Sequence, residues 1–199
     1  MIYKLQRFIP ILFFCLTPVI WGATNYVSFS GSHTPPFTSW ADAATDIQSA
    51  IDVASNGDTV LVTNGTYSTK GVAVYGTMTN RITITKPITV RSVNGPDFTV
   101  IEGQGPLGSN AVRCAYVTNG AALIGFTLTN GYTQNSLNDQ EGGGGAWCET
   151  NALLSNCFII GNRCRSFGGG VYQGILKEAL LIIRGNGVAR RITLLLRIV

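Results

Sequence analysis

Two segments of this sequence repeat the same order of apolar and polar residues, and this repeat limits the possible folds most. Leu123–Asn130 aligns with Leu154–Gly161, apolar over apolar. Gly143–Trp147 recurs as Gly168–Tyr172 after about 25 residues, a period within the range of solenoid repeats. In a solenoid each repeat stacks on its neighbours, so we expect a chain that coils in rungs.

Short segments rich in β-branched residues precede and overlap these repeats, and Gly, Asn and Pro separate them. We interpret the following as strands: Asp58–Val62, Arg81–Thr85, Ile88–Ser92, Phe98–Ile101, Ala111–Val117 and Ala122–Leu128. The predicted fold is all-β, a right-handed parallel β-helix around a narrow column of apolar side chains. The side chains expected inside the column are Val60, Ile84, Val90, Ile101, Ile124 and Ile159.

One helix is expected before the first rung. Ser39 or Thr38 is the predicted N-cap, with Asp42 in the first turn. Small and apolar residues then recur at helical spacing up to Ala54, and Gly57 is expected to end the helix in a left-handed conformation. The predicted organisation is an N-terminal segment with a capping helix over residues 23–57 and rungs over residues 58–174.

The first 22 residues have the order of a secretory signal peptide. Lys4 and Arg7 precede the apolar run Phe8–Leu16, and Pro18 and small residues follow. The run is shorter than the roughly 20 residues that cross a bilayer, so we expect cleavage and no stable transmembrane segment. The expected location is secreted, extracellular or on the cell surface. An uncleaved N-terminal membrane helix is the alternative.

The net charge of +4 does not indicate a nucleic-acid partner. Many of the basic residues lie in the signal segment or after residue 173, and those between are scattered among acidic residues without forming a cluster.

Two segments resemble a known family. Asp46–Val62 with Gly65–Tyr67 looks like the N-terminal cap and first rung of pectin-lyase-like right-handed β-helix proteins. Asn156–Asn162, leading to Gly168–Tyr172, is similar to repeats of bacterial secreted and surface proteins, including polymorphic outer-membrane-protein repeats. The resemblance spans about Trp40 to Gln173 and implies a bacterial protein of the cell surface or outer membrane.

That family contains lyases with calcium-binding carboxylate clusters, hydrolases with paired aspartates, and surface proteins without an assigned activity. Here the one acidic pair at i, i+2 is Asp139 and Glu141, in a predicted loop, so the catalytic signatures are missing and catalytic residues are unknown. We expect a non-catalytic adhesion, display or carbohydrate-contacting module whose partner is a polysaccharide or a cell-surface component. The alternative is a polysaccharide lyase or glycoside hydrolase acting on acidic, pectin-like polysaccharide.

Three acidic residues are the candidates for a calcium ion: Asp139, Glu141 and Glu149. Their spacing matches no known calcium loop, and an ordinary polar loop is the competing interpretation. Arg163 and Arg165 are candidates for contact with an acidic sugar, against a solvated loop. The single histidine, His33, is interpreted as an exposed loop residue rather than a general acid or base.

Four cysteines remain after the signal segment: Cys114, Cys148, Cys157 and Cys164. An even number in an exported chain suggests disulfides, and Cys157 with Cys164 is the predicted pair. Burial as small side chains in the column is the competing interpretation. Their spacing predicts no transition-metal site. Asn64–Thr66 is a glycosylation sequon.

After Gly174 the Asn, Thr and Gly punctuation stops and Leu and Arg become frequent. Residues 175–199 are therefore expected to be an atypical tail, from a frameshift or truncation of a longer solenoid. The alternative is a C-terminal cap in which a hairpin turns at Gly185–Gly187 and ends in Ile192–Leu196. An uncapped last rung predicts self-association through the C-terminal edge.

Overall fold

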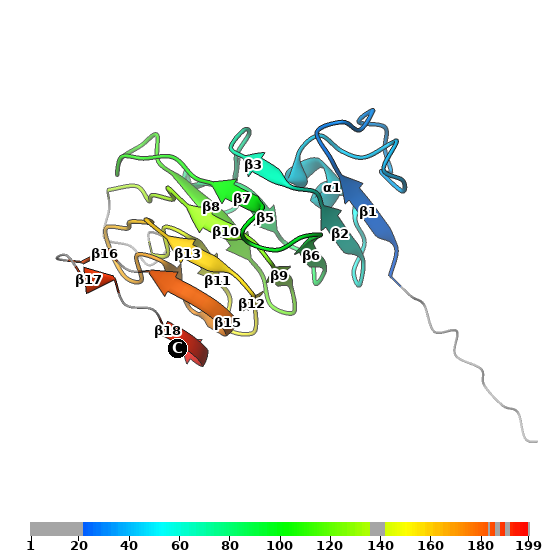
Figure 1. Cartoon of the computed structure of the whole chain (residues 1–199). Helices are drawn as coiled ribbons and strands as arrows, with labels where there is room; N and C mark the ends of the chain where they lie inside the picture. Colours follow the sequence, from blue (N-terminus) through cyan, green and yellow to red (C-terminus); the bar gives the residue numbers. More distant parts are fainter. Residues whose placement is uncertain (1–21, 136–141, 183, 186–187, 190–191, 199) are drawn as a thin grey trace, which may run out of the picture.

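The short β-branched segments form strands that stack on one another from turn to turn. The computed structural model (Figure 1) describes residues 22–135, 142–182, 184–185, 188–189 and 192–198. Its strands build a parallel β-solenoid of about four turns with one short helix near the N-terminus, as the sequence predicted. Each turn contributes one strand to each of three faces.

The first face stacks strands whose inward residues form one side of the core. Val60 pairs with Val90, Val90 with Leu123 and Leu123 with Leu154, and all four are fully buried. Its strands are β1 (Thr24–Val27), β2 (Thr59–Val62), β6 (Thr89–Ser92), β9 (Ala122–Ile124), β12 (Leu153–Ser155) and the first part of β15 (Gly174–Ile182).

The second face follows directly after a corner, and its inward residues are Tyr67, Ile101, Leu128 and Ile159, in register. Its strands are β3 (Gly65–Tyr67), β7 (Thr99–Glu102), β10 (Thr127–Thr129), β13 (Phe158–Ile160) and the last part of β15. Because β15 pairs with both β12 and β13, it joins the first and second faces into one sheet.

The third face is a separate sheet in which Ile82, Ala115, Ala146 and Val171 stack inward. Its parallel strands are β5 (Thr79–Ile84), β8 (Val112–Val117), β11 (Ala146–Cys148) and β14 (Val171–Tyr172), and β4 (Val72–Ala73) runs antiparallel along β5. The three faces enclose one continuous apolar cluster.

The internal repeats correctly predicted the strand register. Leu123 lies beside Leu154 and Leu128 beside Ile159, as in the sequence alignment. Trp147 lies beside Tyr172, as the two glycine-rich segments predicted.

Five of the six side chains expected in the column are buried there, and Ile124 is the exception. In β9 the inward residue is Leu123, so Ile124 points outward and is partly exposed. Strand side chains alternate between faces, and Leu123 and Ile124 are both apolar, so the prediction at Ile124 was wrong by one residue.

The corner between the first and second faces uses the same backbone conformation in successive turns. Gly125, Asn156 and Glu178 all have positive φ, at 79°, 48° and 52°. The Gly125 N–H donates to the Ser155 carbonyl and the Asn156 N–H to the Lys177 carbonyl, both at 3.0 Å. Asparagine tolerates this conformation better than glutamate does, so only Glu178 departs from the usual corner residues.

The helix α1 spans Ile47–Val53, and its N-cap is Asp46, whose carboxylate accepts from the Ser49 N–H at 2.9 Å. The prediction of Ser39 or Thr38 as N-cap was wrong: Ser39 instead accepts from the Asp42 N–H in a preceding turn. Gly57 does have positive φ, but the helix has already ended before it, with Ala54 as the C-cap.

Helix α1 closes the N-terminal edge of the third face through Gln48. The Gln48 side-chain carbonyl accepts from the Thr83 N–H at 2.7 Å, and its NH₂ donates to the Thr83 carbonyl at 3.3 Å. The side-chain amide therefore replaces the neighbouring strand that Thr83 lacks. Because β4 pairs with residues 79–80, the exposed backbone of β5 is occupied along much of its length.

The change of composition after Gly174 does not end the solenoid. Ile175 pairs with Leu153 and Leu180 with Phe158, both in parallel, so the stacking continues through β15. The chain then returns: β16 (Arg184–Gly185) and β17 (Val188–Ala189) form a hairpin, and β18 (Ile192–Ile198) runs antiparallel along β15. The hairpin lies where the cap alternative placed it, and the origin of the tail stays a prediction.

Replacing Ile159 with Asp should abolish folding or lower stability by more than about 4 kcal/mol, because a charge without a partner would enter the column. The matched Ile124→Asp, on the outer surface, should lose about 1 kcal/mol or less. Urea denaturation followed by circular dichroism measures both. Equal losses in the two variants would contradict the assignment of inward and outward positions.

Candidate functional site

A groove lies at the corner after β10 and β13, where the second face turns toward the third. Its volume is about 330 Å³. Six residues from two successive turns line it: Thr129, Tyr132, Ile160, Gly161, Asn162 and Arg163. We call this the corner groove.

Glycine brings the backbones at this corner unusually close. A Cβ on Gly131 would lie 2.0 Å from the Gly144 carbonyl oxygen, so no larger residue fits there without a shift. Asn162 then joins the two turns, because its carbonyl accepts from the Gly131 N–H at 2.8 Å and its NH₂ donates to the Leu128 carbonyl at 2.9 Å. Backbone contacts therefore fix the floor of the groove.

Tyr132 and Arg163 occupy equivalent positions in successive turns and are joined by a parallel β-bridge. The Tyr132 ring packs against Gly105, where a Cβ would lie 2.5 Å from Tyr132 Cε2. Arg163 is exposed, and its backbone N–H donates to the Gly131 carbonyl at 2.8 Å. The groove thus has a positioned aromatic ring beside an accessible guanidinium group.

The lining combines the two kinds of surface that a sugar ring presents. Tyr132 and Ile160 are apolar walls for C–H groups, and Thr129, Asn162 and Arg163 supply polar atoms for hydroxyl or carboxyl oxygens. Its volume lies at the lower end of the range for small-molecule sites. The six described residues that line the groove include no carboxylate.

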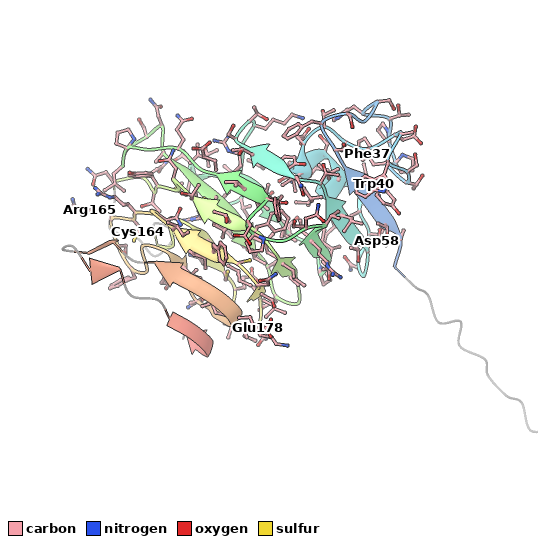
Figure 2. All side chains as sticks on the ribbon, viewed as in Figure 1. Phe37, Trp40, Asp58, Cys164, Arg165 and Glu178 are labelled. Carbon is pink, nitrogen blue, oxygen red and sulfur yellow. The ribbon has the colours of Figure 1, made fainter. Side chains whose placement is uncertain are left out.

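Arg165, the second arginine candidate, is exposed and follows Arg163 by two residues. Its backbone N–H donates to the buried Thr133 hydroxyl at 3.1 Å. Arg165 does not line the groove but lies on the same segment, at the end of the molecule remote from Phe37 and Trp40 (Figure 2).

The outward side of the third face carries an aromatic ladder, which we define as Tyr116, Trp147 and Tyr172. The Tyr116 and Trp147 rings stack at 5.3 Å and the Trp147 and Tyr172 rings at 5.9 Å between centroids. Tyr75 covers Tyr116 edge-on. The hollow beside the ladder has only about 10 Å³, so we assign these rings to packing between turns.

Glu149, one of the calcium candidates, already has three donors. Its carboxylate accepts from the Tyr116 hydroxyl at 2.6 Å, the Thr118 hydroxyl at 3.0 Å and the Asn119 N–H at 2.8 Å. Partial burial alone would raise its pKa, but these hydrogen bonds lower it. Glu149 therefore joins two turns.

The other two calcium candidates, Asp139 and Glu141, lie outside the described residues. Over the part of the chain that the structure describes, no group of three or more His, Cys, Asp or Glu residues is arranged to hold a metal ion.

The predicted disulfide between Cys157 and Cys164 is not formed, and all four cysteines of the described chain are free. Cys114, Cys148 and Cys157 are buried in the core, as the competing interpretation proposed, and Cys164 lies half-buried in a loop. Burial raises the pKa of the Cys114 thiol to about 12 and that of Cys157 to about 11. Buried protonated thiols of this kind pack as small apolar side chains.

His33 is exposed, as expected, and has a structural contact. Its Nδ1 accepts from the Thr45 N–H at 3.0 Å, which ties the loop before α1 to the chain that enters the helix. Asn64 of the sequon is also exposed, and its side-chain carbonyl accepts from the Asn94 amide at 2.8 Å.

Sequence analysis missed Tyr132. The alignment of Leu123–Asn130 with Leu154–Gly161, extended by two residues, places Tyr132 opposite Arg163, which is the observed bridge. The signal was present, but a tyrosine and an arginine do not look like equivalent positions of a repeat.

Comparison with protein-family models, with curated proteins and with solved structures finds no match. The fold and the site define a parallel β-solenoid with a groove at one corner. The comparisons identify no family for this chain. Within the described residues, no helix is long and apolar enough to cross a membrane.

Replacing Glu149 with Gln should make the melting temperature less sensitive to acid. A folded-state pKa below the ordinary value of 4.5 means that Glu149 contributes stability above that pH and loses it as the pH falls through the lower value. Thermal melts from about pH 7 to about pH 3 measure the effect. Asp97→Asn, at an exposed carboxylate, is the control, and identical pH profiles for Glu149→Gln and the unaltered protein would contradict this role.

Proposed function

We propose that this protein is an exported β-solenoid of the pectin-lyase-like type that contacts carbohydrate through the corner groove and acts as a non-catalytic adhesion or display module. The observation that carries the proposal is the pairing of Tyr132 with Arg163 in a groove of about 330 Å³. An aromatic ring beside polar side chains suits a sugar, which has apolar C–H faces and polar edges.

Rigidity supports binding at this position. The groove is built on the ends of β10 and β13 and on backbone contacts at Gly131, not on a long free loop. The Tyr132 ring packs against Gly105 before a ligand arrives, so it loses little conformational freedom on binding, which favours affinity. Even a shallow groove can then be specific.

The shape of the solenoid supports contact with a polymer. Outward residues of the second face line up from turn to turn: Val100 lies beside Thr127, and Thr127 beside Phe158. The groove opens at the corner of this regular surface, so a polysaccharide chain lying along the face would continue into it. A single bound sugar would fill only part of the contact surface.

Location at the cell surface is part of the proposal. It is supported by the signal-like segment of residues 1–22 and by the resemblance to bacterial surface repeats. A stiff solenoid that holds a binding corner away from its attachment point fits a display role.

Tyr132→Ala should weaken binding of a sugar oligomer at least tenfold, about 1.4 kcal/mol, because the apolar wall is lost. Arg163→Gln should weaken it by a smaller factor through loss of the charged donor. Titration calorimetry with cello-oligosaccharide and oligogalacturonate measures both.

Arg91→Gln, at an exposed arginine of the first face, is the matched control and should bind normally. Unchanged affinity in the Tyr132 and Arg163 variants would remove the groove from the account. Release of unsaturated or reducing sugars from any of these oligomers would favour the alternative, a polysaccharide lyase or hydrolase.

A further inference from the structure

The outward side of the second face carries an acidic residue next to the corner groove. Glu102 ends β7, and its register partner on β10 is Thr129, which lines the groove. Residues in register on neighbouring parallel strands lie about 4.8 Å apart, with their side chains on the same side of the sheet. Glu102 is not itself a lining residue, but it lies one strand away from the groove wall.

The Glu102 carboxylate is accessible to a ligand. It is partly exposed, and it forms no hydrogen bond or ion pair with any residue that the structure describes. The buried cation Arg81 lies close by, but its guanidinium donates to the backbone carbonyls of Glu102, at 2.7 Å, and of Lys70. An ionised carboxylate accepts hydrogen bonds and donates none, so Glu102 offers an acceptor beside the groove.

The groove places a donor on the other side of its aromatic ring. Tyr132 packs against Gly105, in the same turn as Glu102, and pairs with Arg163 of the following turn. The turns on either side of Tyr132 therefore carry a carboxylate and a guanidinium group. A sugar ring beside Tyr132 can donate hydroxyl groups to Glu102 and accept hydrogen bonds from Arg163.

The charges along the rest of this face disfavour an acidic polymer. The outward residues of β3, β7, β10 and β13 include no lysine or arginine, and their one charged member is Glu102. They are Thr66, Val100, Glu102, Thr127, Thr129, Phe158 and Ile160. A uronate chain along these strands would bring carboxylates against Glu102, whereas a neutral chain meets no such repulsion.

We propose that the corner groove selects a neutral sugar chain over a uronate chain, and that Glu102 sets this preference. The proposal rests on the proposed contact with carbohydrate and adds the class of sugar to it. Glu102 accepts from the hydroxyl groups of a neutral sugar and repels a carboxylate at the same position. Arg163 taken alone would predict an acidic sugar, and Glu102 reverses that expectation.

The test measures affinities of the mature full-length chain by titration calorimetry, with cellotetraose and mannotetraose as neutral probes and tetragalacturonate as the acidic probe. The unaltered protein should bind a neutral tetramer more tightly than the acidic one. Glu102→Gln should reduce the ratio of the two affinities about fivefold, because it removes a like charge about 5 Å from the ligand in a partly exposed site. Glu102→Lys should reverse the preference.

Asp97→Asn is the matched control. It removes an exposed carboxylate that precedes β7, at the opposite end of that strand from Glu102, and it should leave the ratio of affinities unchanged. Circular dichroism melts show whether each variant folds, and the outward position of Glu102 predicts melting temperatures close to that of the unaltered protein.

Two results would overturn the choice of a neutral sugar while the proposed contact with carbohydrate stands. They are tighter binding of tetragalacturonate by the unaltered protein, and a ratio of affinities that Glu102→Gln and Glu102→Lys leave unchanged. Absence of binding by all three tetramers would overturn both proposals.

Discussion

Every other feature of this molecule depends on the in-register stacking of one turn on the next. A parallel strand pair holds its side chains in a fixed order, so Val60, Val90, Leu123 and Leu154 either all face the core or all face solvent. A slip of one residue in any turn would reverse that turn and place polar residues in the column. The apolar cluster, the glycine corner and the groove exist only in the correct register.

Such stacking leaves unpaired backbone at each end, and the two ends close in different ways. Helix α1 closes the start, and a single side chain, Gln48, supplies both the donor and the acceptor that Thr83 needs. The returning strand β18 closes the first and second faces at the other end. The same constraint explains why this chain of short strands is covered by a helix near its start and by an antiparallel strand near its end.

Sequence analysis predicted what repeats and missed what occurs once. The alignment of Leu123 with Leu154 gave the correct register because apolar positions recur from turn to turn. It placed Ile124 wrongly because two adjacent apolar residues carry no alternation. The N-cap was assigned to Ser39 or Thr38 instead of Asp46, since both regions offer capping side chains and only the packing of α1 decides between them.

The tail and the groove were harder for a physical reason. Glu178 takes the positive-φ corner conformation that Gly125 and Asn156 take. Because glutamate is uncommon in that conformation, the sequence showed no sign that the turns continue through β15. The groove depends on Tyr132 and Arg163, which are equivalent in position but different in chemistry. The even number of cysteines suggested a disulfide between Cys157 and Cys164. Cys157 is instead buried in the column, where its thiol packs as a small apolar side chain.

The site inherits its geometry from the stacking, because glycine contacts between turns set the corner on which Tyr132 and Arg163 are held. Amide hydrogen exchange on the mature chain tests this central claim most directly. Amides that bond between turns, such as those of Ala122, Leu153 and Phe158, should exchange slowly, and amides of the exposed residues 68–71 and 75–77, on either side of β4, should exchange fast. Fast exchange at Leu153 and Phe158 would show that the turns do not stack and would contradict the account.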